Sequence, residues 1–249
     1  KGFSQRQGVD YFETFAPVIR LESVGTLVAL AAENDWELFQ ADVSSAFLNA
    51  ELEETVFIRQ PRGYETYAPN GQQHVLRLHR SIYGLRQAPR CWNTLLHKFL
   101  LAQGLQRSEA DPCVYIKRTE AGIVVVGIYV DDLLFTGSDR SGINDLRAAL
   151  ADEFKIKDLG ILHHYLGIAV NRTADGITMS QRQYVVDLLN QFGMEECHPT
   201  ATPLVAKQKL TRDMSPVTDA ELQRMADIPY RSAVGSLMYL ALATRPDIA

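Results

Sequence analysis

The chain has 249 residues, of which 46% are hydrophobic, and a formal net charge of −5 at pH 7. This composition supports a buried core for one large domain or two smaller ones. No run approaches the ~18 apolar residues of a membrane span, and three widely spaced cysteines argue against a disulfide framework and fit a reducing, intracellular compartment.

The first half of the chain alternates between helical and extended patterns. Apolar residues at helical spacing predict an amphipathic helix over residues 20–34, and a short apolar run predicts a strand ending at Asp42. Residues 56–58 are a further predicted strand. Residues 75–78 are expected to pair back with it across the turn-rich segment 63–73.

The second half continues with a helix that Pro89 is expected to open, because proline is favoured in the first helical turn. A hairpin is predicted over residues 113–130, and Ser141 is expected to cap the helix that follows. A strand over 164–170, a turn over 171–176, a helix around 184–192 and a linker over 200–216 complete the chain. This order predicts an α+β fold, an antiparallel sheet backed by helices on one face.

Basic residues are concentrated in one part of the chain. Between Arg59 and Arg118 there are ten Lys or Arg and three Asp or Glu, so this stretch carries 10 − 3 = +7 and the remainder −12. A basic stretch of this kind can follow a phosphate backbone. A set of unrelated surface arginines is the alternative.

Two adjacent carboxylates, Asp131 and Asp132, stand between two apolar runs. Residues 122–128 are rich in β-branched side chains and predict a buried strand, and residues 133–137 predict a second one. Unpaired carboxylates beside a core are unfavourable unless the turn is exposed or a cation binds there. An exposed hairpin turn, which favours Asp, is therefore the plain alternative to a metal site.

Asp42 is a third strand-end carboxylate, 131 − 42 = 89 residues before Asp131. If the two strands are neighbours in one sheet, their carboxylates emerge at the same edge. Mg²⁺ takes carboxylate oxygens together with substrate phosphates, and two such ions can act on the attacking and leaving oxygens of phosphoryl transfer. The pattern therefore indicates a nucleotide polymerase, with a capping turn toward Ser44 and Ser45 as the alternative role for Asp42.

A strand-end Asp followed by a distant Tyr-Val-Asp-Asp hairpin resembles the palm of a reverse transcriptase. Further segments resemble the copia-like retrotransposon form of that enzyme, in the family's order: residues 1–5, 10–18, 42–49, 78–92, 157–160, 165–168, 230–240 and 244–248. Because the chain begins and ends inside such segments, an internal piece of a Pol polyprotein is expected. The family's basic fingertip residues are then expected to precede Lys1.

The resemblance implies a right-hand polymerase. Its ferredoxin-like antiparallel palm would comprise residues 35–48 and 81–170, and residues 1–34 and 49–80 would be partial fingers. Residues 171–249 would form a helical thumb and the start of the connection toward RNase H.

The resemblance also implies roles for individual residues. Asp42 and Asp131 would bind two Mg²⁺ ions, which Mn²⁺ can replace, with Asp132 as a less direct ligand. Lys155 or Lys157 would protonate pyrophosphate, although each could instead be a solvated surface lysine. Nucleotide binding is assigned to Val43, Phe47, Tyr83, Arg86 and Gln87, and primer or template binding to Ala88, Pro89, Arg90, Tyr129, Val130, Tyr165, Leu166 and Gly167.

Two aromatic residues have a specific expected role and an alternative. Phe47 stands where reverse transcriptases place a ring under the sugar, which leaves no room for a 2′-hydroxyl. Both Phe47 and Tyr129 could instead be core aromatics. Tyr83 stands where retroviral enzymes often carry glutamine.

The expected function is RNA-directed DNA synthesis in retrotransposon replication by two-metal-ion nucleotidyl transfer. The expected partners are an RNA or DNA template with its primer, deoxynucleoside triphosphates, and the RNase H and integrase segments of the polyprotein, with no membrane. The expected location is the cytoplasm, in a virus-like particle. The alternatives are a catalytically inactive nucleic-acid-binding remnant, an RNA-templated RNA polymerase, which Phe47 disfavours, and a ferredoxin-like binding module, which would not need three carboxylates.

Overall fold

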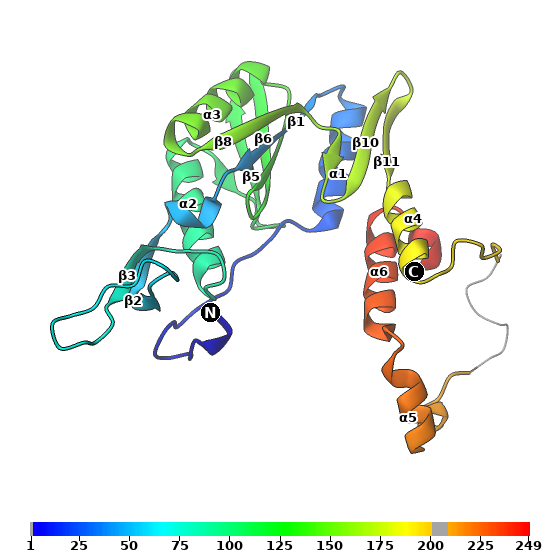
Figure 1. Ribbon diagram of the computed structural model, residues 1–249. Coiled ribbons are helices and arrows are strands. Elements are labelled where there is room, and N and C mark those ends of the chain that lie inside the picture. The colour runs from blue at the N-terminus through cyan, green and yellow to red at the C-terminus, as the bar shows by residue number, and fades with distance from the viewer. Residues whose placement is uncertain (1, 201–208) are drawn as a thin grey trace. The chain divides into compact units, whose positions relative to one another are not determined.

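A computed structural model describes residues 2–200 and 209–249 and divides the chain into two units, Lys1–Leu162 and His163–Ala249 (Figure 1). Each unit has its own sheet. Most of the predicted linker at residues 200–216 lies outside the described residues. None of the helices in the described ranges is long and apolar enough to cross a lipid bilayer.

The first unit is built on a six-stranded antiparallel sheet with the strand order β4-β5-β6-β7-β1-β8. Strands β4 to β7 follow one another along the chain as a meander, whereas β1 comes from earlier in the sequence and lies between β7 and β8. The bounds are β1 Leu38–Val43, β4 Gln106–Arg107, β5 Val114–Thr119, β6 Gly122–Tyr129, β7 Asp132–Thr136 and β8 Ile156–Ile161.

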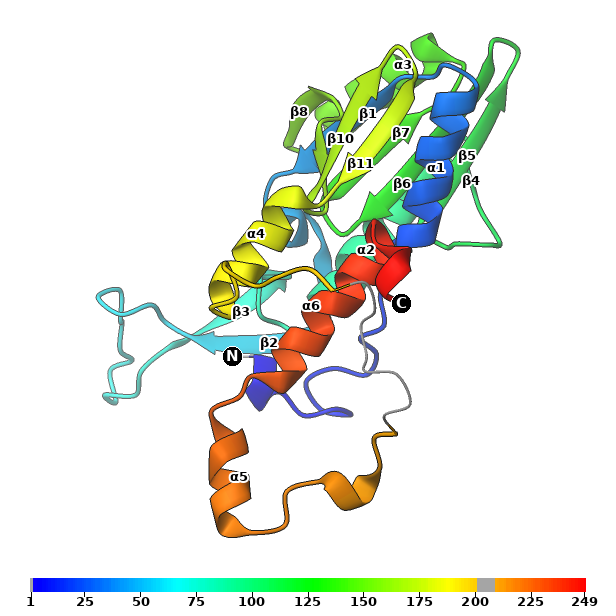
Figure 2. The ribbon, with the colours of Figure 1, turned by 90° about the vertical axis from the view of Figure 1, so that its right-hand side faces the viewer.

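Helices cover both faces of this sheet. They are α1 (Leu21–Glu33), α2 (Ala88–Ala102) and α3 (Arg140–Glu153). Two glycines show which helix packs on which face. At Gly142 of α3, a Cβ atom would lie 2.9 Å from Val124 Cγ2 of β6. At Gly127 of β6, a Cβ atom would lie 3.3 Å from Leu27 Cδ1 of α1. Val124 and Gly127 are three apart in β6 and therefore face opposite sides. Figure 2 shows α1 on one face of the sheet and α3 on the other. The prediction that helices back only one face is wrong, because α1 covers the second face.

The central part of the unit follows the chain order β1-α2-β6-β7-α3-β8, with the spatial order β6-β7-β1-β8. This is the arrangement of a ferredoxin-like β-α-β-β-α-β unit. A two-stranded ribbon of β2 (Glu51–Arg59) and β3 (Val75–Arg80) is inserted between β1 and α2. The predicted pairing across residues 63–73 is confirmed, with Val56 opposite Leu78.

The second unit begins with a three-stranded sheet of order β11-β10-β9. A ring contact joins two of its helices, because Tyr184 of α4 lies edge-on to Tyr239 of α6 with ring centroids 5.0 Å apart. The bounds are β9 His164–Tyr165, β10 Ile168–Thr173, β11 Gly176–Ser180, α4 Arg182–Gln191, α5 Asp219–Ala226 and α6 Tyr230–Ala243. Short 3-10 helices occur at Gly2–Ser4, Ala46–Asn49, Arg212–Met214 and Pro246–Ile248.

Several predicted elements need correction. Asp139, and not Ser141, caps α3, because its Oδ1 accepts the Gly142 N–H at 2.8 Å. The predicted strand over 164–170 is a hairpin that turns at Leu166 and Gly167, both at positive φ. Strands β8 and β11 were not predicted, since β8 mixes charged residues and glycine and so lacks a clear apolar alternation.

Candidate active site

Three carboxylate residues lie at one end of the sheet. Asp42 on β1 lies directly opposite Asp132 on β7. Asp131 stands in the two-residue turn between β6 and β7, and its carbonyl oxygen accepts the Val43 N–H at 2.9 Å. The condition set out above, that β1 and the Asp-Asp hairpin are neighbours in one sheet, is met. The Val43 side chain is buried, so this residue reaches the site through its backbone.

The strand register extends this end of the sheet into a row of polar side chains. Tyr129 lies opposite Asp132, and Lys157 on β8 lies opposite Asp42. Directly paired residues present their side chains on the same face, so a phenol, two carboxylates and an ammonium group form one row. Tyr129 is 36% exposed and is therefore not a core aromatic. Lys155 precedes β8, and its carbonyl oxygen accepts the Ser44 N–H at 2.9 Å.

The carboxylates crowd one another electrostatically. Partial burial raises the pKa of Asp132, and the negative charges of Asp131 and Asp42 raise it further, against a hydrogen bond from Gln40 Nε2 at 3.4 Å. The Tyr83 hydroxyl donates to Asp131 Oδ2 at 3.3 Å. Burial and then the charge of Asp131 raise the pKa of Tyr83, so it remains a protonated donor at neutral pH. A cation at this edge would relieve the repulsion.

The donor set fits a hard divalent cation. Carboxylate oxygens are the side-chain ligands that such ions prefer. Within residues 2–200 and 209–249, no three His, Cys, Asp or Glu side chains close around a common point as a complete metal site. Mg²⁺ needs less from the protein, since one or two carboxylates, water and substrate phosphates can complete its shell. Asp42, Asp131 and Asp132 are the residues at this edge whose carboxylates could supply such a partial ligand set.

Backbone strain marks the same region. Among the described non-glycine residues, four have positive φ, and two of these lie in the segments that carry Asp42 and Asp131: Ser45 at +54° and Val130 at +55°. For the β-branched Val130 this conformation is a clear outlier. Strain of this kind persists only where the surroundings enforce it, and it clusters at functional sites. Valine carries no sequence signal for a left-handed turn, so sequence reasoning missed this feature.

Phe47 lies beside the carboxylates in the 3-10 helix Ala46–Asn49. Its ring is tilted against that of Tyr83, with centroids 4.4 Å apart, and the Ser81 hydroxyl donates to its carbonyl oxygen. Phe47 is 8% exposed and Tyr83 is 57% exposed. The outer surface of this aromatic pair is therefore mostly Tyr83, the residue that also contacts Asp131.

The predicted nucleotide-binding and template-binding block at residues 86–90 holds the N-terminal segment. Gln87 is 1% exposed, and its amide bonds with Gln5 at 3.0 Å, Asp10 at 3.1 Å and Glu54 at 3.3 Å. Nucleotide contact by Gln87 would require exchange of these bonds. Ala88 is also buried and Pro89 is half-buried in the first turn of α2, so their side chains have little surface for a primer.

The two arginines of this block also contact the N-terminal segment. The Arg86 Nε donates to the Gly2 carbonyl oxygen at 2.9 Å, and Arg90 forms an exposed ion pair with Glu13 at 3.5 Å. Sequence reasoning did not predict these partners. The only sequence signal for them is that residues 1–18 contain segments of the family resemblance, which carries no information on these contacts.

The predicted primer-contacting turn lies in the second unit. Leu166 and Gly167 connect β9 and β10, and the Tyr239 hydroxyl of α6 donates to the Leu166 carbonyl oxygen. A Cβ at Gly167 would lie 3.1 Å from that hydroxyl, so the close approach favours glycine. Tyr165 is buried at 1% exposure and anchors the turn. Tyr239 was not singled out from the sequence.

Comparison with known proteins identifies a family and several relatives that match this chain in sequence. Residues 1–206 match the family described as Reverse transcriptase (RNA-dependent DNA polymerase). The Retrovirus-related Pol polyprotein from transposon TNT 1-94 of Nicotiana tabacum is 42% identical over 253 residues, covering 100% of this chain and 19% of the relative. The corresponding polyprotein from transposon RE2 of Arabidopsis thaliana is 38% identical, covering 100% of this chain and 16% of the relative.

A yeast relative matches over a shorter range. The Transposon Ty1-BR Gag-Pol polyprotein of Saccharomyces cerevisiae is 29% identical over 153 residues, covering 58% of this chain and 8% of the relative. The chain thus spans less than a fifth of the length of each of these three curated relatives. Together with the family match, they confirm the resemblance to the copia-like form, and the chain belongs to the reverse transcriptase family.

Proposed function

We propose that this chain carries the polymerase site of an RNA-directed DNA polymerase, which extends a primer by two-metal-ion nucleotidyl transfer. The observation that supports it most is the pairing of Asp42 with Asp132 across β1 and β7, with Asp131 in the adjoining turn. Membership in the reverse transcriptase family supports the same reaction.

In this proposal Asp42 and Asp131 hold two Mg²⁺ ions, and Asp132 adds negative charge at the same edge of the sheet. When bound there, the ions would supply Lewis acidity that lowers the pKa of the primer 3′-hydroxyl and balances the triphosphate charge. Tyr83 orients the Asp131 carboxylate through its 3.3 Å hydrogen bond. The Phe47 and Tyr83 rings would lie against the sugar of the incoming nucleotide and leave no space for a 2′-hydroxyl.

Of the two candidate lysines, Lys157 is our choice for the acid that protonates the departing pyrophosphate. Its place opposite Asp42 presents its side chain on the same sheet face as the carboxylates. Lys155 lies before β8 and has no such pairing. A lysine ammonium is acidic enough to give up a proton when the leaving oxygens gain charge.

The wider organisation is part of the same proposal. The palm would comprise residues 35–48 and 81–170, the fingers 1–34 and 49–80, and the thumb 171–249. Tyr165, Leu166 and Gly167 would hold the primer, and Arg86 and Arg90 would contact phosphates. The partners would be a primed RNA or DNA template, deoxynucleoside triphosphates and RNase H and integrase segments, in a cytoplasmic virus-like particle.

Single-nucleotide addition to a primer tests the proposal. We expect Asp131→Asn to lower the rate by several orders of magnitude with circular dichroism unchanged, while Asp145→Asn, at an exposed position of α3, serves as the matched control. Lys157→Ala should slow addition far more than Lys155→Ala. Normal extension by Asp131→Asn would refute the metal assignment, and tight primer–template binding without any extension by the wild type would favour the inactive remnant.

A further inference from the structure

A buried tryptophan contacts the turn that carries Asp131. Trp92 of α2 is 1% exposed, and its indole Nε1 donates to the Val130 carbonyl oxygen at 2.7 Å, across 38 residues of sequence. The indole is held in turn by Phe154, which lies edge-on with ring centroids 5.2 Å apart and planes at 80°. The donor is therefore fixed by core packing and aimed at the backbone of the hairpin.

The turn needs such a contact because its first residue is strained. Val130 has φ +55°, a left-handed conformation that a β-branched side chain disfavours. The next carbonyl along, that of Asp131, accepts the Val43 N–H at 2.9 Å. Both carbonyl groups of the turn are thus held from outside the hairpin, one by the indole and one by the backbone of β1.

We propose that Trp92 is a positioning residue, which holds Val130 in the left-handed conformation and thereby sets the Asp131 carboxylate for cation binding. This inference rests on the proposed function, because it assumes that Asp131 is a metal ligand. Trp92 does not need to touch substrate. It acts through the backbone, as groups behind metal ligands commonly do, and the loss of such a group typically lowers metal affinity about 10–100-fold.

The alternative is that Trp92 only fills the core, and a double-mutant cycle separates the two roles. Trp92→Phe removes the indole donor and keeps an aromatic ring. Val130→Gly removes the strain, because glycine adopts positive φ without a steric penalty. If Trp92 acts by enforcing the turn, the effect of Trp92→Phe on the site should largely disappear in the Val130→Gly background. A purely structural role predicts the same loss in both backgrounds.

The experiment is a Mn²⁺ titration of the full chain by calorimetry. We expect Trp92→Phe to weaken Mn²⁺ binding by about tenfold or more, and the same change on Val130→Gly to weaken it by less than about threefold. Trp36→Phe, at the second of the chain's two tryptophans, is the matched control and should leave the affinity unchanged.

A second measurement follows the hydrogen bond itself. With two tryptophans, the chain gives two indole N–H signals in a nitrogen–proton correlation spectrum, and Trp92→Phe identifies one of them. That signal should exchange slowly with solvent and shift in Val130→Gly. Rapid exchange, unchanged Mn²⁺ affinity in Trp92→Phe, or a loss that Val130→Gly does not reduce would overturn the inference. Equal Mn²⁺ binding by wild type and Asp131→Asn would instead overturn the proposed function, while slow indole exchange would still support the hold on the turn.

Discussion

At the scale of single residues, Phe47 and Tyr83 act as one surface. Phe47 is nearly buried, and the exposed Tyr83 ring lies against it. A sugar placed beside Asp131 would therefore meet both rings. Sequence reasoning assigned Phe47 and Tyr83 to nucleotide binding separately, because a separation of 83 − 47 = 36 positions hides their contact.

Replacement of Phe47 by Ala should open space at the sugar. We expect ribonucleotide incorporation to rise about 10²-fold relative to deoxyribonucleotide incorporation, because steric exclusion of the 2′-hydroxyl is lost. Competition between the two nucleotide types in primer extension measures the ratio. Tyr83→Phe keeps the ring and should preserve the ratio. An unchanged ratio in a folded Phe47→Ala protein would make Phe47 a core residue.

Asp132 should limit the stability of the metal-free protein at neutral pH. Burial and the charges of Asp131 and Asp42 raise its pKa in the folded state above the ordinary value of 3.8. The folded protein thus holds this proton more tightly than the unfolded chain, and its stability falls as pH rises from about 3.8 through the raised pKa. Asp132→Asn should therefore raise the melting temperature at pH 7, and the gain should shrink below the ordinary Asp pKa.

Thermal unfolding without divalent cations, at neutral and acidic pH, measures this effect. Asp145→Asn is again the exposed control. A lower melting temperature for Asp132→Asn at pH 7 would show that the carboxylate stabilises the fold, contrary to this prediction.

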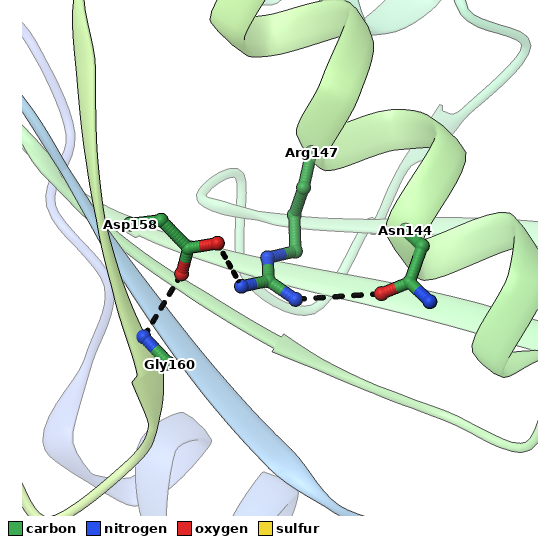
Figure 3. Close-up of polar contacts among 4 residues, drawn as sticks. All are labelled: Asn144, Arg147, Asp158 and Gly160. Atoms are coloured by element: carbon green, nitrogen blue, oxygen red, sulfur yellow. Dashed lines mark hydrogen bonds and ion pairs between the residues drawn. The ribbon is translucent and has the colours of Figure 1, made fainter.

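At the scale of elements, Arg147 ties α3 to the edge strand β8 (Figure 3). Its guanidinium pairs with Asp158, whose other oxygen accepts the Gly160 N–H at 2.8 Å. The hydrogen bond from Arg147 lowers the pKa of Asp158. Arg147 also lies over the Phe39 ring of β1, 4.9 Å from its centroid. These contacts hold the strand that presents Lys157.

Arg147→Gln should loosen β8 and leave the rest of the sheet in place. We expect a loss of about 1 kcal/mol in unfolding free energy, since one partner is largely exposed, and faster hydrogen exchange of the amides of residues 156–161. Arg140→Gln is the matched control, because Arg140 also lies 4.9 Å from the Phe39 centroid but pairs with Glu37. Equal exchange in the two variants would count against this role.

At the scale of the whole molecule, charge distribution matters more than net charge. The stretch from Arg59 to Arg118, with its charge of +7, lies entirely within the first unit, although the chain as a whole carries −5. Under the proposed function, phosphate contacts from this stretch would release counterions when nucleic acid binds, so an overall acidic protein could still bind it.

Primer–template binding should weaken steeply as salt rises. Each phosphate contact adds about 0.9 to the slope of log affinity against log salt. Arg77→Gln, on the exposed β3, should lower that slope by up to about 1, whereas Arg77→Lys keeps the charge and should keep the slope. Fluorescence anisotropy across a salt series gives both values. A salt-independent affinity for the wild type would contradict electrostatic binding through this stretch.

Local elements could be predicted from the sequence because their causes lie within a few residues. The apolar spacing that predicts a helix over 20–34 matches α1, and Pro89 lies in the first turn of α2. The β-branched run before Asp131 is β6. The strand-end positions of Asp42 and Asp131 raised the possibility that β1 pairs with the Asp-Asp hairpin, and the register shows that pairing.

The tertiary structure alone decided the features that depend on distant residues. The choice of Lys157 depends on the strand register, which shifts at a bulge between Gln40 and Ala41, and a shift of one residue turns every later side chain to the other face. The positive φ of Val130 and the indole that holds it belong to separate elements, joined only by the packing of α2 against the hairpin. Sequence by itself indicated the candidate residues, because their types and spacing are local, whereas packing between segments far apart in the chain determined how those residues are held.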